Sequence, residues 1–280
     1  MNLNHIQHKD WRLLDSSAFP LVGEALLPFA VDELECRLIG KGAQPLLHIW
    51  RHKRAFILGL RDRKLERAHL AMEALGKRGY AVAVRNSGGA AVPLDDGVLN
   101  ISLILPNPSG ITKLHDDFAI LAGLIQETTY RLAGNVEGLA TNVAVDVGEI
   151  AGAYCPGAFD LAIEGRKFCG IAQRRQTGAY IVQAFIVIEG VGAERARLVA
   201  DYYRDAAGAN ESGYPIVNEQ TTASLQELIE NASVEHFVRE FKKNLLGDKE
   251  LSREFNSYDG YNEFELSQLI KQMVNRYDTN

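Results

Sequence analysis

Cysteine is scarce in this chain of 280 residues, with three in all: Cys36, Cys155 and Cys169. An odd number cannot all pair within one chain, and such sparse use is typical of a reducing compartment. Neither a CxxC nor an HExxH spacing is present. The sequence therefore predicts neither a disulfide framework nor a metal site.

Long hydrophobic runs and an excess of positive charge are also missing. The N-terminal segment MNLNHIQHKDWRLLD has no apolar core, so we expect no signal peptide. The apolar stretch Ile181–Ile188 is far shorter than a bilayer span. With a net charge of -6, the chain has no overall attraction for nucleic acid or anionic membrane. We expect a cytoplasmic protein without nucleic-acid or membrane partners.

What is present is ordinary globular composition, with 46% hydrophobic and 24% charged residues and no internal repeat. Segments of helical and strand periodicity alternate along the chain, which predicts an α/β fold with a mixed sheet. We expect one main domain over residues 1–247 and a C-terminal helical tail over 248–280 packed on it, since 33 residues are too few for a separate core.

Several elements follow from local patterns. Residues 159–163 and 167–172 flank Glu164-Gly165-Arg166 and predict a hairpin, and Ser224 with Glu227 forms a capping box. Further strands are expected at Leu46–Trp50 paired with Phe56–Leu60, and at Tyr80–Arg85, Val98–Leu105 and Ala179–Ile188. Further helices are expected at Leu65–Leu75 and His115–Leu132, around Val234–Phe241 and around Leu266–Met273.

Three segments carry residues capable of chemistry. The first, between two predicted strands, is Arg85-Asn86-Ser87-Gly88-Gly89-Ala90-Ala91-Val92. Paired glycines let the backbone approach a ligand, and successive N–H groups there can hold an oxyanion or a carbonyl oxygen. A plain turn, with Arg85 reaching solvent, is the alternative for this segment alone.

The second segment is Tyr154-Cys155-Pro156-Gly157, directly before the hairpin. Pro156 and Gly157 predict a turn, which places Cys155 on a loop where a thiol can be exposed and activated. The alternative is a small hydrophobic residue packed beside a turn.

The third segment is Glu164–Arg175, which includes the hairpin's second strand. Strand alternation predicts Lys167, Cys169 and Ile171 on one face. If that face borders the site, the Lys167 ammonium lies near the Cys155 sulfur and favours the thiolate over the thiol. A solvated hairpin is the alternative, and Cys169 among apolar neighbours is better explained as packing.

Together and in this order, the segments resemble the lipoate ligase and octanoyltransferase family, which is related in fold to biotin ligases. The motif at Arg85–Val92, followed by Asp96-Gly97 and Asn100, resembles the family's lipoyl-binding loop and next strand. The run Gly165-Arg166-Lys167 through Gln173 resembles its lysine motif. The resemblance extends over residues 28–247 and implies a mixed, mainly antiparallel sheet flanked by helices.

Two departures from the ATP-dependent ligases of this family favour a transferase. Those ligases carry a histidine in the glycine-rich segment, where this chain has Val92-Pro93-Leu94-Asp95. They also carry a C-terminal accessory domain, whereas the 33 residues after Gly247 are too few for a separate domain. Cys155, twelve residues before Lys167, resembles the nucleophile of the Gram-positive cysteine acyltransferases, and its surroundings resemble their amidotransferase branch.

The resemblance implies a reaction and its participants. Cys155 accepts an octanoyl or lipoyl group as a thioester from a lysine of the glycine cleavage H protein, and lysines of lipoyl domains of dihydrolipoamide acyltransferase subunits then receive it. Lys167 stabilises the thiolate and transfers the proton, and no ATP, metal or other cofactor takes part. Substrate-binding residues are expected at Arg85, Asn86, Ser87, Gly88, Gly89, Ala90, Asn100, Gly170, Ile171 and Ala172, with slot walls also near Leu103. Partner docking is expected at Arg166, Arg174 and Arg175.

Three other functions remain open at this point. An ATP-dependent lipoate ligase would use Lys167 on an acyl-adenylate, an octanoyltransferase would draw on acyl carrier protein, and a non-catalytic protein would only bind lipoyl domains. The sequence gives neither the preferred acyl group nor the oligomeric state.

Overall fold

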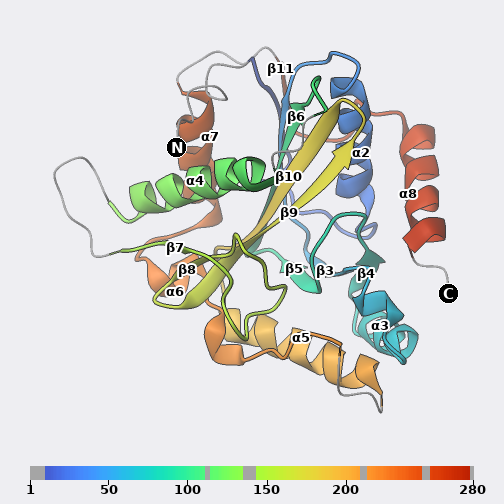
Figure 1. Ribbon diagram of the computed structural model, residues 1–280, viewed down its shortest axis with the longest axis vertical. Coiled ribbons are helices and arrows are strands. Elements are labelled where there is room, and N and C mark those ends of the chain that lie inside the picture. Colours follow the sequence, from blue (N-terminus) through green and yellow to red (C-terminus); the bar gives the residue numbers. More distant parts are fainter. Residues whose placement is uncertain (1–9, 111–113, 135–142, 209–212, 248–252, 278–280) are drawn as a thin grey trace.

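The computed structural model describes residues 10–110, 114–134, 143–208, 213–247 and 253–277. A large sheet runs through the molecule with helices on both faces, and a small sheet lies beside it near α3 and α5 (Figure 1). The prediction of an α/β fold with a mixed sheet is confirmed. The expected absence of a signal peptide concerns residues 1–15, of which residues 1–9 lie outside the described residues.

The large sheet has the strand order β11-β1-β2-β6-β10-β9-β8-β7. Its strands from β2 to β7 pair antiparallel, whereas β1 pairs parallel with both β2 and β11. The strands are β1 (Arg12–Asp15), β2 (Leu46–Trp50), β6 (Val98–Pro106), β7 (Asp146–Val147), β8 (Leu161–Ile163), β9 (Arg166–Gln176), β10 (Ala179–Val187) and β11 (Arg253–Phe255).

The small sheet corrects one expectation. Its strands, in the order β4-β3-β5, are β4 (Ala81–Val84), β3 (Arg54–Leu58) and β5 (Val92–Asp95). The prediction that residues 46–50 pair with residues 56–60 is therefore wrong, because β2 and β3 belong to different sheets. The connection does not turn back on itself, since Leu21 exchanges backbone hydrogen bonds with Arg51 and Lys53 and leads the chain away.

Helices cover both faces of the large sheet. Figure 1 shows α4 and α7 on one side and α2 and α8 on the other. Each side has its own apolar core, and the Ser224 capping box is present as predicted. The helices are α2 (Leu27–Ile39), α3 (Ala68–Lys77), α4 (Leu114–Leu132), α5 (Gly192–Ala207), α6 (Leu225–Leu228), α7 (Val234–Leu246) and α8 (Glu263–Tyr277), with 3-10 turns η1 (Asp62–Lys64) and η2 (Glu219–Thr221).

The C-terminal segment contributes a strand to the large sheet and a helix to the side that α2 covers. Strand β11 extends the large sheet beyond β1, and α8 packs against α2. Tyr258 and Tyr261, between these elements, hydrogen-bond to His48 and Glu35. The division at residue 247 into a domain and a tail stays a prediction. Among the described helices, none is long and apolar enough to cross a membrane.

Candidate active site

Cys155 lies on the loop that precedes β8, as the Pro-Gly turn predicts. Its backbone has φ 48°, a left-handed conformation that is uncommon outside glycine. Such a conformation costs roughly 1–3 kcal/mol and persists only where the surroundings enforce it. The residue is 8% exposed, whereas Cys36 and Cys169 are fully buried in the apolar cores. The packing role expected for Cys169 is confirmed, whereas Cys155 is the cysteine that lines a pocket.

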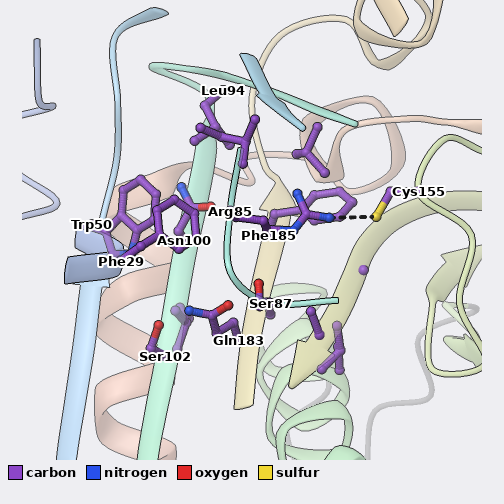
Figure 2. A pocket seen from close by; sticks show the side chains of 17 residues that line it. Phe29, Trp50, Arg85, Ser87, Leu94, Asn100, Ser102, Cys155, Gln183 and Phe185 are labelled. Carbon is purple, nitrogen blue, oxygen red and sulfur yellow. Dashed lines mark hydrogen bonds between the residues drawn. The ribbon is translucent and has the colours of Figure 1, made fainter. Parts of the chain in front are cut away.

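Two donors from the glycine-rich segment reach this sulfur. The backbone N–H of Ala90 donates to the Sγ of Cys155 at 3.2 Å, and the Nη2 of Arg85 lies 3.6 Å from it. Figure 2 shows the guanidinium pointing at the sulfur from the pocket side. A hydrogen bond or a positive charge beside sulfur favours the thiolate, which is the nucleophilic form of cysteine.

Arg85 also fixes the shape of the glycine-rich loop. Its Nε donates to the carbonyl of Gly88 at 2.9 Å and its Nη2 donates to the carbonyl of Ala90 at 2.6 Å. The loop passes so close that a Cβ on Gly89 would lie 2.4 Å from Nη2 of Arg85 and 2.9 Å from Sγ of Cys155. Gly89 also has φ +99°. This position therefore requires glycine both for its backbone conformation and for the space.

A buried acid and a tyrosine hold the loop from the other side. Tyr203 of α5 accepts a hydrogen bond from the Ala91 N–H at 3.2 Å and donates to the Oδ1 of Asp62 at 2.9 Å. Oδ2 of Asp62 accepts from the N–H of Gly59 at 2.8 Å. Burial raises the pKa of Asp62, against the hydrogen bonds that lower it. Sequence reasoning missed these two residues, because no local pattern links a tyrosine on a helix to a turn about 140 residues earlier.

Lys167 lies against the backbone of Cys155. Its Nζ donates to the carbonyls of Tyr154 at 2.9 Å and Cys155 at 2.5 Å, and pairs with the Oδ1 of Asp160 at 2.9 Å. Oδ2 of Asp160 accepts from the N–H of Gly157 at 3.1 Å. Burial raises the pKa of Asp160 to about 6, although the Lys167 charge opposes this. The expected role of Lys167 beside the sulfur stays a prediction.

The alternation expected along β9 is interrupted. Leu161 is opposite Cys169 and Ala162 is opposite Lys167, so Phe168 is an extra residue in a bulge. Phe168 and Cys169 both pack in the core beneath α4 and α7, while the Lys167 ammonium lies over the Phe185 ring. The bulge reorients Lys167 relative to the rest of the strand, a change that a two-residue period does not predict.

An apolar slot adjoins the sulfur. Its cavity volume is about 50 Å³, and most of its lining side chains are apolar. In Figure 2, Cys155 lies on one side and Phe29 with Trp50 on the other. The lining residues are Phe29, Trp50, Ile57, Arg85, Ser87, Val92, Leu94, Asn100, Ile101, Ser102, Cys155, Gly170, Ile171, Ala172, Gln183, Ala184 and Phe185.

The floor of the slot is fixed by Asp32 of α2. Its carboxylate accepts hydrogen bonds from Ser102 at 2.5 Å and Gln183 at 2.9 Å, and lies 2.7 Å from the Nδ1 of His48. The slot wall expected around Leu103 is formed by its neighbours on β6, because the side chain of Leu103 itself packs in the opposite core. Successive residues of a strand face opposite sides, so β6 contributes Asn100 and Ser102 instead.

Most expected substrate-binding residues meet at this slot. Arg85, Ser87, Asn100, Gly170, Ile171 and Ala172 line it. Gly88, Gly89 and Ala90 form the loop at the sulfur. Asn86 faces away and donates to the Oε2 of Glu33 at 3.1 Å. These positions agree with a binding role, but the role of each residue stays a prediction.

The three expected docking arginines differ in their surroundings. Arg174 forms a two-pronged ion pair with Glu33, and Arg175 pairs with Asp117. Burial acts to raise the pKa of Glu33, but Arg174 outweighs it and the pKa is lowered. Arg166 pairs with Glu164 at 3.4 Å at the tip of the hairpin and has the most exposed side chain of the three. Arg174 and Arg175 thus connect β9 to α2 and α4.

Within the described residues, no group of three His, Cys, Asp or Glu side chains is arranged to hold a metal ion. The chemistry that the arrangement supports is nucleophilic. It combines a strained loop cysteine, two donors on its sulfur and an adjoining apolar slot.

Comparison with known proteins decides the family. The model of the lipoyl protein ligase A/B catalytic domain matches residues 24–246. The chain belongs to the lipoyl protein ligase A/B catalytic domain family. The resemblance found in its motifs is thereby confirmed.

Two curated relatives of this lipoyl protein ligase family member are transferases. The chain is 37% identical over 228 residues to a protein of Lysinibacillus sphaericus named octanoyl-[GcvH]:protein N-octanoyltransferase, covering 80% of this chain and 79% of that protein. It is 34% identical over 224 residues to the lipoyl-[GcvH]:protein N-lipoyltransferase of Listeria monocytogenes, covering 79% and 77%.

Among solved structures, a putative lipoate protein ligase of T. acidophilum has a TM-score of 0.65 and 19% identity, with 97% of each chain covered. At this identity the likeness shows the fold, and the lipoyl protein ligase-like architecture expected from the motifs is confirmed.

Proposed function

We propose that this protein is an acyltransferase that moves an octanoyl or lipoyl group from a lysine of the glycine cleavage H protein to lysines of lipoyl domains, through a thioester on Cys155. The observation that carries the proposal is the Cys155 sulfur, held by the Ala90 N–H at 3.2 Å beside an apolar slot. The relatives named for transfer from GcvH support the choice of donor.

The first half of the reaction forms the thioester. The Cys155 thiolate attacks the carbonyl carbon of the donor's acyl-lysine amide, the carbon–sulfur bond forms and the carbon–nitrogen bond breaks. The departing lysine nitrogen takes up one proton and leaves as an amine. Backbone N–H groups of the Gly88–Ala90 loop, or of Gly170–Ala172 on β9, stabilise the negative charge that develops on the carbonyl oxygen.

The second half reverses these steps with another lysine. The acceptor's neutral ε-amine attacks the thioester carbonyl and releases one proton to water, the carbon–sulfur bond breaks and the thiolate returns. An amide is broken and an amide is formed, so the transfer needs no ATP and runs in both directions. Two steps let donor and acceptor proteins use the same mouth in turn.

The slot supplies the affinity for the acyl chain. Burial of each methylene contributes about 0.8 kcal/mol. The walls formed by Val92, Leu94, Ile171 and Phe185 are apolar along the course of such a chain. For docking, Arg166 is the first candidate, because its charge is the most exposed of the three arginines.

The test is intact-mass spectrometry of the enzyme mixed with octanoylated H protein, with and without ATP. We expect an octanoyl adduct without ATP, mapped by peptide analysis to Cys155. Cys155→Ala should abolish both adduct and transfer, while the matched control Cys169→Ala retains most of both because that thiol is sealed in the core.

Three results would reject the proposal. An adduct that requires ATP indicates a ligase, and an adduct formed only from acylated carrier protein indicates a different donor. Binding of lipoyl domains without any adduct or turnover indicates a protein that only binds them.

A further inference from the structure

Two cations approach Cys155 from different elements and contact different atoms of it. The Nη2 of Arg85 lies 3.6 Å from the sulfur, whereas the Nζ of Lys167 donates to the carbonyl oxygen at 2.5 Å. We infer that Arg85 is the catalytic residue whose charge stabilises the Cys155 thiolate, and that Lys167 with Asp160 is a positioning pair that fixes the turn carrying the sulfur.

The hydrogen bonds of Lys167 support the positioning role. The Lys167 ammonium donates hydrogen bonds to the Tyr154 and Cys155 carbonyls and forms an ion pair with the Asp160 carboxylate at 2.9 Å. Asp160 in turn accepts from the N–H of Gly157 on the far side of the turn. The ion pair thus holds the backbone on both sides of Cys155. Since its two charges are 2.9 Å apart, their fields partly cancel at the sulfur.

The backbone of the turn explains why it needs such a pair. Cys155 has φ 48° and is followed by Pro156, which restricts its backbone further. The carbonyl oxygens of Tyr154 and Cys155 converge on one ammonium, and without this cation the two oxygens would repel each other. Lys167 is itself anchored, because its own carbonyl accepts from the N–H of Ala223 at 3.0 Å.

The surroundings of Arg85 support the catalytic role. Its side chain is buried at 6% exposure, and its hydrogen-bond acceptors are two backbone carbonyls and the sulfur. No carboxylate within the described part of the chain forms an ion pair with it. A buried guanidinium without a counter-ion is costly. The thiolate of Cys155 supplies a negative charge in contact with the guanidinium, in addition to the more distant carboxylate of Asp62.

The other titratable groups around the sulfur come from several elements. Lys167 of β9 and Asp160 of the preceding loop face it through the turn, and Tyr203 of α5 with Asp62 behind it faces it through the loop. Arg85 is the cation among these that contacts the sulfur.

The test is the pH profile of iodoacetamide alkylation of Cys155 in the free enzyme, followed by peptide mass spectrometry. In Arg85→Gln we expect the midpoint to rise by about one pH unit, which lowers the alkylation rate near pH 7 about tenfold. The rate on the high-pH plateau should remain within about twofold of wild type. Arg85→Lys keeps the charge and should recover at least about half of the shift.

In Lys167→Met and Asp160→Asn we expect the alkylation midpoint to stay within about 0.3 units, while acyl transfer falls about a hundredfold at every pH because the sulfur is misplaced. Arg61→Gln, on an exposed arginine near the same loop, is the matched control and should change neither quantity. Thermal melting establishes that each variant is folded.

A shift of about half a unit or more in Lys167→Met overturns the assignment, and so does an unmoved midpoint in Arg85→Gln. A low plateau in Arg85→Gln also overturns it, because the loss would then come from geometry rather than charge. The inference rests on the proposed function for its meaning in catalysis, but the alkylation assay uses no acyl donor. If octanoylated H protein leaves no adduct while the profiles behave as expected, the proposed function fails alone.

Discussion

Replacing Gly89 by alanine tests the geometry of the reaction centre most directly. The new Cβ would lie 2.4 Å from Nη2 of Arg85, about 1 Å short of ordinary contact, and 2.9 Å from Sγ of Cys155. The backbone at φ +99° adds strain of roughly 1–3 kcal/mol for any residue with a side chain. Both strain and clash are relieved only if the loop, the guanidinium or the sulfur moves.

A misplacement of about 1 Å at reacting groups costs roughly a hundredfold in rate. We therefore expect Gly89→Ala to lower acyl transfer about a hundredfold, measured by mass spectrometry of the lipoyl-domain product, and to lower the free energy of unfolding by roughly 1–3 kcal/mol.

Gly88→Ala is the matched control, because a Cβ on Gly88 would meet nothing within 4 Å. It should retain transfer within about twofold. Wild-type transfer by Gly89→Ala, or an equal loss in both variants, would refute the close approach of loop and sulfur.

Three further predictions follow from buried contacts. Gly170→Ala should lower octanoyl transfer about tenfold more than transfer of a four-carbon acyl group. The reason is that its Cβ would lie 2.6 Å from the Phe185 ring and push that ring into the slot. Equal losses for both acyl donors would contradict this prediction. Burial raises the pKa of Asp160 from 3.8 to about 6, so its contribution to stability is present below about pH 4 and is lost as pH rises through 6. Asp160→Asn should remove the part of the pH dependence of the unfolding free energy that lies between about pH 4 and 6, measured in urea titrations. An unchanged pH dependence would argue against a raised pKa of Asp160. Tyr258→Phe removes the hydroxyl bonded to His48 and should lower the free energy of unfolding by about 1–3 kcal/mol without changing Cys155 alkylation; a change in alkylation would connect the C-terminal segment to the sulfur.

Local patterns in the sequence were sufficient to predict most of the helices and strands. The hairpin before and after Glu164, the capping box at Ser224 and the long helix over residues 115–132 each depend on neighbours within a few positions, and each is present. The strand pair at residues 46–60 was predicted wrongly because a short connection favours a hairpin. Here Leu21, about 30 residues earlier in the chain, takes the backbone hydrogen bonds instead.

The candidate site divides in the same way. Cys155, the glycine-rich loop and Lys167 were found from motifs and turn chemistry. The motifs did not predict which atoms of these residues are in contact, because Arg85 and Ala90 contact the sulfur across 70 and 65 positions of sequence. Asp62 and Tyr203 were missed for the same reason. No periodicity relates such distant positions.

The sequence by itself determined the fold class, the family and the position of a candidate nucleophilic cysteine on a loop, because periodicity, turn residues and motif order are local properties of the chain. Only the tertiary structure decided that the Arg85 guanidinium faces the sulfur and that the Lys167 ammonium holds the backbone of the turn. The physical reason is the bulge at Phe168, which reorients Lys167, together with the packing that places the loop after β4, strand β9 and the Cys155 loop around one apolar slot.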